Sequence, residues 1–586
     1  MHANSKTRLR VLSGLVIFFS LLFVVRLYYL QVLHGAQFLA EAEKQYVANI
    51  ANQFDRGSIY FQTRQGKLVT GATINGGYVV SITPKLLEDK ESAYKAISTI
   101  APLPYDAFIE KAKKIADPYE EILKRVPEAE AFQIRALRLP GLQIFRETWR
   151  YYPGGSLAAQ VLGFVGHNGK SLVGQYGLES YYNDSLSRHD DDLYVNFFAE
   201  LFTNIRGAVF DRSREDEADI VLTIEPTVQA YLEEELKNIM EEWQSDLSGG
   251  IIMDPKTGAI VAMAVNPSFD LNEYGKVKDG TMFANPSIQD VYEMGSIVKP
   301  LTVAAGLDAG VISANTTYND TGHITMNNKT FSNYDGRGRG PGTSMQEVLN
   351  QSLNTGVAFI VGKLGNAAFA DYMIQKFHLG DETGIDLPGE RQGNVTNLSS
   401  KRDLEYAQAS FGQGIAVTPI NMIAALATLS NGGVTVTPHI VDEIRYTSGR
   451  VKKFTPNPPQ QALKPETSEE ISRMLVTVVD KALLGGSVKI PEYSIAAKTG
   501  TAQIYRPREL GGGYYDDRYL HTFFGYFPAY DPKFIVFLYT KNPKNAEFAS
   551  HTLTHPFIRT TKFLLHYYGV APDRAPGIAP SVKPKP

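Results

Sequence analysis

The chain has 586 residues, of which 43% are hydrophobic and 20% are charged, and its formal net charge at pH 7 is −4. This length is enough for two or three domains, and the charge gives no electrostatic support for nucleic-acid binding. Because there are no cysteines, disulfides, thiolate catalysis and cysteine-based zinc sites are excluded. The eleven histidines lack the paired spacing of a zinc enzyme, so we expect no metal and no other cofactor.

An apolar segment near the N-terminus predicts a single transmembrane anchor over residues 11–33. Apart from Arg26 the segment carries no charge, and its length of about 23 residues is sufficient, since about 20 helical residues cross a bilayer. Basic side chains within residues 1–10 place that tail in the cytoplasm. A cleaved signal peptide is the alternative, but no good cleavage site follows the apolar run. In either case residues 34–586 lie outside the cytoplasm.

Residues 34–215 mix short strand-like and helical patterns, and we expect them to form a pedestal domain. Residues 77–82 have the apolar composition of a strand. Apolar spacing predicts helices over 105–116 and 128–137. The charged stretch 206–217 is a plausible hinge into the next domain.

We expect a second domain over residues 216–570. It opens with a predicted strand at 220–224 and a helix at 226–243, where Pro226 suits the first helical turn. Two strands, 250–253 and 259–265, are joined by a loop with turn-forming residues and predict a hairpin.

Three further strands are predicted late in the chain, with helices in between. The fold class that follows is α+β, an antiparallel sheet flanked by helices. The proline-rich tail 571–586 is expected to be disordered. The late strands are at 494–498, 522–527 and 534–539, and one of the helices is at 418–429.

Ser296 and Lys299 form a Ser-x-x-Lys motif at the expected start of a helix running to about residue 307. Positions i and i+3 share a helix face, so Lys299 can reach the Ser296 hydroxyl. A lysine can deprotonate a serine only if burial or neighbouring cations lower its pKa. The same pattern at Ser92 and Lys95 lies in a charged stretch that is typical of a solvated helix, and we expect no chemistry there.

Ser352 and Asn354 form a Ser-x-Asn motif. The Ser352 hydroxyl could relay a proton between the nucleophile, the lysines and a leaving amine, and the Asn354 amide could bind Lys299 or a substrate carbonyl. Alone, this pair is more typical of a helix cap or turn.

Lys498, Thr499, Gly500 and Thr501 form a Lys-Thr-Gly-Thr motif that continues an apolar strand. A strand edge can bind an extended peptide through main-chain hydrogen bonds, and Gly500 leaves space for the substrate backbone. Lys498, with the two threonine hydroxyls, would hold a carboxylate. The Lys-Thr-Gly at 256–258 lies in the predicted hairpin loop and is interpreted as a turn.

The order and spacing of these three motifs resemble the penicillin-recognising serine enzymes, and the chain as a whole is similar to class B penicillin-binding proteins. Other segments carry the likeness: Arg-Gly-Ser-Ile at 56–59, Gly-Gln-Tyr-Gly-Leu-Glu at 174–179, the hairpin at 254–262 and Ser-Phe-Gly-Gln-Gly at 410–414. The resemblance implies a penicillin-binding, β-lactamase-like transpeptidase fold on a dimerisation-type pedestal.

It also implies an activity, a membrane location and partners. Ser296 would attack the penultimate D-Ala of a D-Ala-D-Ala stem peptide, with the backbone N–H groups of Ser296 and Thr501 as the oxyanion hole. Lys299, Ser352, Asn354 and Lys498 would be catalytic, and Thr499, Gly500 and Thr501 would bind substrate. β-Lactams would acylate Ser296. A SEDS-family glycosyltransferase in the bacterial plasma membrane would polymerise the glycan.

Two other interpretations remain open at this point. A D,D-carboxypeptidase or β-lactamase of the same fold would finish the reaction with water, and the motifs do not distinguish these from a transpeptidase. A non-catalytic scaffold or β-lactam sensor would retain the fold only. The anchor and pedestal favour a transpeptidase for cell-wall synthesis, with septal synthesis slightly favoured over elongation.

Overall fold

The computed structural model describes residues 14–15, 17–23, 26, 54–169, 171–188 and 217–574. They separate into two compact units, and each is treated by itself. Unit 1 holds residues 74–150 with the described residues up to 55, and unit 2 holds 56–73 and everything from 151 onward. The predicted domains 34–215 and 216–570 are continuous ranges and do not coincide with these units, so they stay a prediction.

Unit 1 is a small α+β body in which three helices pack on strands. The second part of β2 (Leu68–Ile82) pairs antiparallel with β3 (Glu120–Val126), and β4 (Leu142–Tyr151) also pairs with β2. Alternate residues of β2, including Val80 and Ile82, enter one core with residues of all three helices. The helices are α3 (Lys90–Ser98), α4 (Tyr105–Ala112) and α5 (Glu128–Ala136), so two of the predicted helices are present, with α4 shorter than expected.

Unit 2 contains a first sheet built from segments far apart in sequence. β7 (Ala218–Leu222) lies between β1 (Ile59–Gln62), to which it is parallel, and β14 (Val441–Tyr446), to which it is antiparallel. β1 continues to the start of β2, and β14 to β15 (Val451–Lys453). The strand predicted at 220–224 thus exists, but it does not belong to the sheet that carries the late strands.

That second sheet has five antiparallel strands in the order β16-β17-β18-β8-β9. It joins the predicted hairpin, β8 (Leu247–Met253) and β9 (Ile260–Asn266), to β16 (Ala496–Tyr505), β17 (Tyr514–Phe527) and β18 (Phe534–Lys541). The predicted antiparallel sheet flanked by helices is confirmed. β16 is at one edge.

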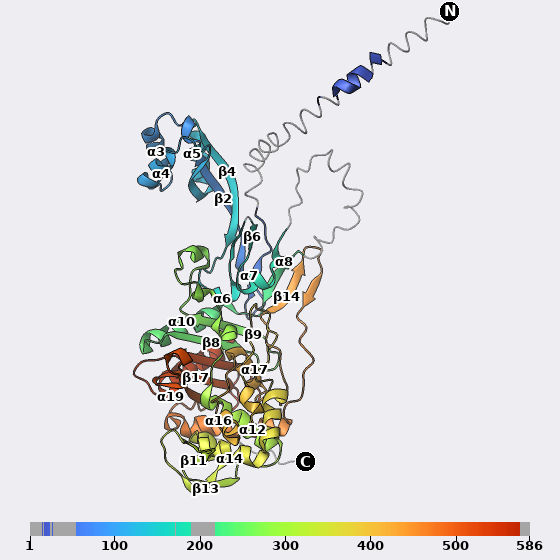
Figure 1. The fold of residues 1–586 in the computed structure, drawn as a ribbon, viewed down its shortest axis with the longest axis vertical. Coiled ribbons are helices and arrows are strands. Elements are labelled where there is room, and N and C mark those ends of the chain that lie inside the picture. Colours follow the sequence, from blue (N-terminus) through green and yellow to red (C-terminus); the bar gives the residue numbers. More distant parts are fainter. Residues whose placement is uncertain are drawn as a thin grey trace, which may run out of the picture. The chain divides into compact units, whose positions relative to one another are not determined.

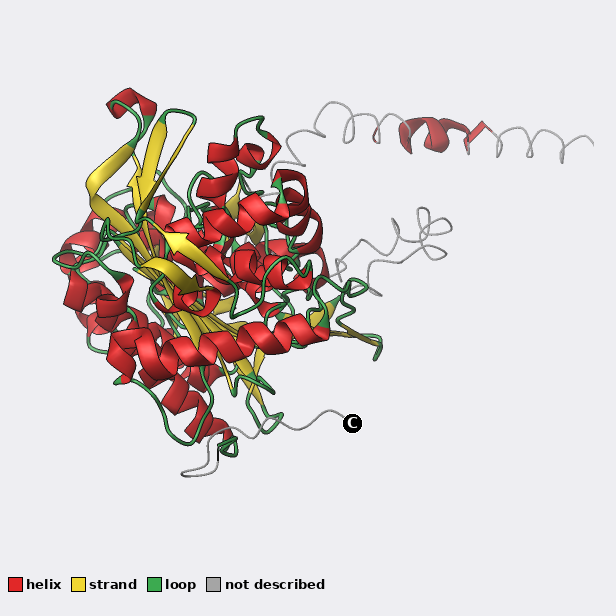
Figure 2. Cartoon of the chain, turned by 90° about the horizontal axis from the view of Figure 1, so that it is seen from below, coloured by secondary structure: helices red, strands yellow, loops and turns green. Residues whose placement is uncertain are grey.

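Alternation along the strands divides the two faces of this sheet. Phe523 and Val536 face a core that includes α10 (Pro226–Trp243) and α20 (Thr554–Tyr568). Their neighbours Phe524 and Ile535 face the other core, as expected for a strand period of two. Figure 1 shows α10 beside β8 and β9, and Figure 2 shows the strands running between helices. The helices of the second face include α12 (Lys299–Asp308), α14 (Asn354–Leu364), α16 (Asp403–Ala409), α17 (Pro419–Ala427) and α18 (Pro465–Thr477).

The ends of the chain are only partly described. Most of the predicted anchor 11–33 lies outside the described residues. Within those that are described, no single helix has the length and apolar character to cross a membrane; one pair bent by 107°, Asn354–Leu364 with Asn366–Lys376, passes by length and composition only. The tail predicted from 571 is described up to Arg574, which pairs with Asp480, while Asp573 accepts from Ser494 N at 2.7 Å. These first tail residues are therefore packed.

Candidate active site

The Ser296 segment is a tight turn that leads into a helix. Residues Gly295–Val298 form the 3-10 helix η6, and α12 begins at Lys299, so the single predicted helix is divided in two. Gly295 has a φ of +63°, which favours glycine. A Cβ at this position would lie 2.7 Å from the Thr501 carbonyl oxygen. The glycine therefore allows the backbone before Ser296 to lie directly against β16.

Lys299 lies in the core behind this turn. It is 0% exposed, and its Nζ donates to the Ser352 carbonyl oxygen at 2.5 Å and contacts the Ser352 hydroxyl oxygen at 3.2 Å. Within the described part of the chain the Ser296 hydroxyl has no hydrogen bond, so the predicted Lys299–Ser296 bond is not formed here. Hydrogen bonds of this kind are often long before substrate binds.

Ser352 occupies a loop between α13 (Met345–Asn350) and α14. Its φ of +55° is uncommon for a residue with a Cβ and costs of order 1–3 kcal/mol. Strain of this kind persists where the surroundings impose it, as the contacts with the two lysines do here. Asn354 begins α14, and its amide donates to the Ser332 carbonyl at 2.7 Å, which is neither of the partners predicted for it.

Lys498 also contacts Ser352, from a different segment of the chain. It lies on β16, is 3% exposed, and its Nζ is 3.0 Å from the Ser352 hydroxyl oxygen and 3.1 Å from the Thr499 carbonyl. Two lysines from different segments thus share one hydroxyl group as a partner.

Burial changes the protonation of both lysines. Burial and the adjacent charge of Lys498 lower the pKa of Lys299 well below the usual lysine range. Burial lowers the pKa of Lys498 to about 7. Two ammonium groups near one oxygen in a desolvated core repel each other, so the arrangement favours a state in which one lysine is neutral and can accept a proton.

The edge strand β16 places the rest of the Lys-Thr-Gly-Thr motif beside the turn. A Cβ at Gly500 would lie 2.3 Å from Thr522 Oγ1 and 2.7 Å from the Met294 carbonyl, so glycine is required for this close approach. Thr501 Oγ1 accepts from Ala549 N at 3.1 Å, and its own O–H is still able to donate to an anion. Thr499 is half-buried on the same strand.

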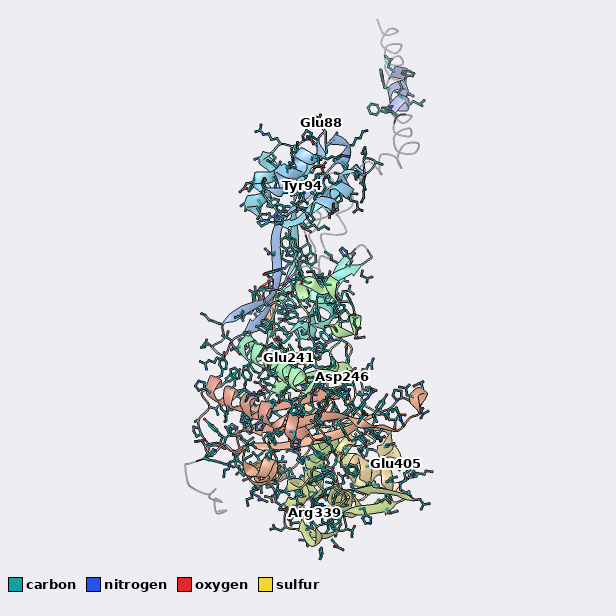
Figure 3. The ribbon with its side chains drawn as sticks, turned by 90° about the vertical axis from the view of Figure 1, so that its left-hand side faces the viewer. Glu88, Tyr94, Glu241, Asp246, Arg339 and Glu405 are labelled. Carbon is teal, nitrogen blue, oxygen red and sulfur yellow. The ribbon has the colours of Figure 1, made fainter. Side chains whose placement is uncertain are left out.

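The two duplicate motifs lie elsewhere, as predicted. Ser92 is exposed at the start of α3 in unit 1 and donates to Asp89 at 2.6 Å; Tyr94 of the same helix is labelled in Figure 3. Lys256 forms an ion pair with Asp531, and Gly258 closes the β8–β9 turn by donating to the Asp254 carbonyl at 2.9 Å. Ser92 and Lys256 are therefore not part of the site.

Two carboxylates near the site were not predicted from the sequence. Asp320 is 1% exposed and accepts from Thr355 Oγ1 at 2.8 Å and from Asn333 Nδ2 at 3.1 Å, which holds the residue after Asn354. Glu293 precedes the nucleophile turn and accepts from Tyr514. Adjacency to the Ser-x-x-Lys motif was the only sequence signal for Glu293, and none indicated Asp320.

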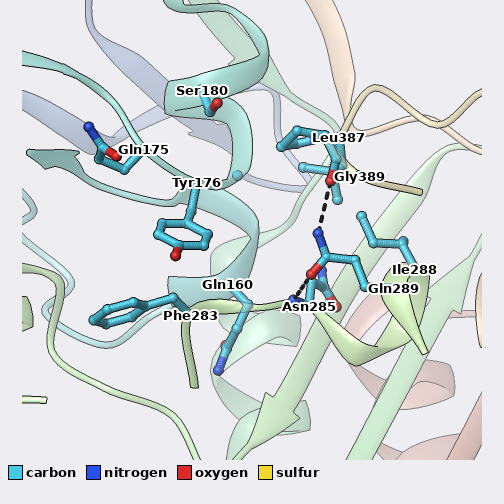
Figure 4. Close-up of a pocket in the computed structure, with 12 residues that line it drawn as sticks. Gln160, Gln175, Tyr176, Ser180, Phe283, Asn285, Ile288, Gln289, Leu387 and Gly389 are labelled. Carbon is cyan, nitrogen blue, oxygen red and sulfur yellow. Dashed lines mark hydrogen bonds between the residues drawn. The ribbon is translucent and has the colours of Figure 1, made fainter. Parts of the chain in front are cut away.

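A cavity of about 190 Å³ lies elsewhere in unit 2. It is lined by amide and aromatic side chains, and Gln289 donates across it to the Pro388 carbonyl at 3.2 Å, as Figure 4 shows. None of the motif residues lines it, so it is separate from the lysine–serine cluster. Among its lining residues are Gln160, Gln175, Tyr176, Phe283 and Asn285.

Comparisons with known proteins agree with this geometry. Residues 249–560 match the family model described as penicillin binding protein transpeptidase domain, and residues 52–196 match the penicillin-binding protein dimerisation domain. Stage V sporulation protein D of Bacillus subtilis is 29% identical over 560 residues, covering 94% of this chain and 83% of that protein. Peptidoglycan D,D-transpeptidase FtsI of Escherichia coli is 27% identical over 475 residues, covering 79% and 75%.

Solved structures agree in fold. Penicillin binding protein 2X of Streptococcus thermophilus superposes with a TM-score of 0.71 at 18% identity, covering 89% of this chain and 81% of that one. Penicillin binding protein 3 of Mycobacterium tuberculosis, solved in complex with aztreonam, gives 0.67 at 22% identity, covering 91% and 100%.

Proposed function

Because the chain belongs to the penicillin-binding protein transpeptidase family, we propose that it is a serine-type peptidoglycan D,D-transpeptidase that cross-links stem peptides in cell-wall synthesis and is inhibited by β-lactams. The observation that carries this proposal is the convergence of Lys299 and Lys498 on the Ser352 hydroxyl, at 3.2 and 3.0 Å, next to the turn that presents Ser296. The relatives named D,D-transpeptidases support it.

In this proposal Lys299, in its neutral form, accepts the proton of Ser296 as the oxygen attacks the penultimate D-Ala carbonyl. Backbone N–H groups of Ser296 and Thr501 stabilise the oxyanion. The bond to the terminal D-Ala breaks, and that residue leaves after its amine receives a proton, relayed through Ser352. An amine of a neighbouring stem then attacks the ester and forms the cross-link; the proton that it loses passes to the Ser296 oxygen, which is released as the free hydroxyl.

The substrate's carboxylate and backbone are assigned to β16. Protonated Lys498 and the hydroxyls of Thr499 and Thr501 would hold the terminal carboxylate. Because β16 is an edge strand, its outer backbone groups are available to an extended peptide. The Asn354 amide, which donates to Ser332, would turn to a substrate carbonyl on binding.

A fluorescent penicillin tests the site directly. We expect wild-type protein to be labelled covalently and mass spectrometry to place the adduct on Ser296. The Ser296→Ala variant should lose labelling, whereas Ser92→Ala, which changes the duplicate motif, should keep it. Labelling that survives Ser296→Ala would contradict the proposal.

A D,D-carboxypeptidase is the second candidate, because the same acyl-enzyme can be hydrolysed. Incubation with a pentapeptide stem and a D-amino acid acceptor separates the two. A transpeptidase should give an acceptor adduct that increases with acceptor concentration, and a carboxypeptidase should give only the shortened stem and D-Ala.

We also propose that residues 11–33 anchor the chain in the bacterial plasma membrane, with residues 1–10 cytoplasmic and the catalytic domain outside. The partner would be a SEDS-family glycosyltransferase, and septal synthesis is slightly favoured over elongation. Fractionation of cells expressing the full chain and the chain from residue 34, followed by co-purification of the glycosyltransferase, tests both parts. A full chain found only in the soluble fraction would refute the anchor.

A further inference from the structure

The carboxylate of Glu293 joins three segments around the nucleophile. Glu293 lies three positions before Ser296, and its Oε1 accepts from Gly414 N at 3.0 Å and from the Tyr514 hydroxyl at 2.9 Å. Tyr514 also contacts Oε2 at 3.0 Å. One side chain thus connects the nucleophile segment to a loop and to the sheet.

The loop that contains Gly414 itself packs on the nucleophile turn. Gly295 N donates to the Gly412 carbonyl at 3.2 Å. A Cβ at Gly412 would lie 2.2 Å from the Gly295 carbonyl oxygen, and its φ of +80° favours glycine. Because Glu293 holds Gly414, it also restrains the nearby Gly412 carbonyl, which accepts from Gly295 N.

Tyr514 belongs to the strand pair that carries the other half of the site. It begins β17 and pairs with Tyr505 at the end of β16, and the two rings are nearly perpendicular with centroids 6.2 Å apart. Further along the same strand, Thr522 of β17 donates to the Met294 carbonyl at 3.0 Å. The hydrogen bond from Tyr514 is thus a second link between β17 and residues 293–296.

These contacts favour the ionised form of the carboxylate. The N–H of Gly414 and the hydroxyl of Tyr514 both donate to it, and these bonds oppose the effect of burial, which raises the pKa of Glu293. A glutamine could accept both bonds on its one carbonyl oxygen, but it lacks the charge that strengthens them and places an NH₂ group where Oε2 contacts the Tyr514 hydroxyl at 3.0 Å.

We propose that Glu293 is a positioning residue for acylation, which fixes the turn bearing Ser296 against both the Gly412–Gly414 loop and the β16–β17 strand pair. The proposal rests on the transpeptidase function proposed above. Glu293 acts through the backbone of the turn, so its removal should slow the chemical step while leaving the initial binding of a β-lactam unchanged.

The test measures the saturating acylation rate constant and the dissociation constant of a fluorescent penicillin by stopped flow, with thermal unfolding of each variant. Glu293→Gln should lower the saturating rate constant about tenfold, because small displacements of reacting groups carry large rate costs. Tyr514→Phe, which removes only the link to β17, should lower it about threefold, and the double variant should be no slower than Glu293→Gln, as expected for coupled residues.

Glu390→Gln is the matched control. Glu390 also accepts two backbone N–H groups, from Thr383 at 2.8 Å and Gly384 at 3.0 Å, and burial likewise raises its pKa. This variant should lose stability without a change in the saturating rate constant.

Several results would overturn the inference. They are an unchanged rate constant in Glu293→Gln, a loss confined to the dissociation constant, or an equal loss in Glu390→Gln. If Glu293→Gln does not fold, Tyr514→Phe decides by the same criteria. A wild-type protein that is not acylated at all would instead contradict the proposed transpeptidase function.

Discussion

Lys498 Nζ lies 3.0 Å from the hydroxyl oxygen of Ser352. The bond joins the edge strand of the sheet to a loop of the helical face, and Lys299 reaches the same hydroxyl from the core at 3.2 Å. A hydroxyl between two lysines can accept from one and donate to the other when that one is neutral. A proton relay needs this arrangement. Removal of the Ser352 hydroxyl should therefore prevent proton transfer between the two lysines.

Substituting Ser352 by alanine should therefore lower the rate of penicillin acylation by a factor on the order of 10²–10⁴, the usual contribution of a positioned proton-transfer group. The measurement is the acylation rate constant at pH 7.5. Ser344→Ala is the control: Ser344 caps α13 by accepting from Glu347 N at 3.3 Å, so its loss should cost about 1 kcal/mol of stability with acylation kept. Equal acylation losses in both variants would contradict the relay.

Acylation should depend on pH in a way that Lys498 controls. The rate should rise with pH as Lys299 loses its proton, and it should fall again as Lys498, whose pKa burial lowers to about 7, loses the charge that holds the substrate carboxylate. Lys498→Arg keeps its charge at all accessible pH values, so its alkaline limb should disappear even if its maximal rate is lower.

Lys256→Arg, in the duplicate Lys-Thr-Gly, should leave the wild-type profile unchanged because Lys256 pairs with Asp531 at the surface. The measurement is the acylation rate constant of the wild type, Lys498→Arg and Lys256→Arg from about pH 5 to about pH 10, just below the reference pKa of lysine. An alkaline limb retained in Lys498→Arg would remove Lys498 from this role.

Replacing Lys299 by methionine should stabilise the protein while abolishing acylation. The pKa of Lys299 is lower in the folded state than in the unfolded state. The free energy of unfolding is therefore highest above the unfolded-state pKa, and it decreases as the pH falls toward the folded-state pKa. At pH 7 to 8, which is below the unfolded-state pKa of lysine, the wild type is destabilised in this way, and methionine should recover about 1–2 kcal/mol, a trade-off common at active sites. Denaturant unfolding should also show a smaller pH dependence in the variant.

The control for that experiment is Lys237→Met, which changes an exposed lysine on α10. Its stability should stay within about 0.5 kcal/mol of the wild type. If Lys299→Met is less stable than wild type at pH 8, the proposed cost of burying this lysine is wrong.

Gly500→Ala should disrupt the contact between β16 and the nucleophile turn. The new Cβ would meet Thr522 Oγ1 at 2.3 Å and the Met294 carbonyl at 2.7 Å, so the strand has to move, at a cost of about 1–3 kcal/mol. Acylation should fall at least about tenfold. Gly362→Ala in α14, where nothing lies within 4 Å of the new atom, should be neutral or stabilising. A full rate in Gly500→Ala would show that the contact is dispensable.

Local sequence patterns predicted the parts of the site that depend on short-range geometry. The Lys299, Ser352 and Lys498 motifs were identified from residue type and spacing, and they meet in the structure. The helix 226–243 was predicted with its bounds, and Pro226 marked its start. The structure adds a cap that was not predicted, because Glu225 accepts from Val228 N at 2.8 Å.

Partners that are distant in sequence were not predictable in the same way. Asn354 binds the Ser332 carbonyl, and nothing in the Ser-x-Asn motif specifies which backbone oxygen lies beside it. A strand was predicted at 220–224 from composition and is found at 218–222, but composition does not say that it pairs with β1 and β14. The Ser296 helix was expected to be continuous because apolar spacing cannot distinguish a 3-10 turn from the first turn of an α-helix.

The position of β16 at the edge of its sheet has a consequence for how the site could evolve. Backbone amides recognise any extended peptide of the right handedness and ask little of its side chains. Selection for a different stem peptide would therefore act on the loops that border the strand, while the strand itself and the glycine that brings it against Met294 would be difficult to alter. A β-lactam that mimics the peptide backbone exploits the part of the enzyme with the least freedom to change.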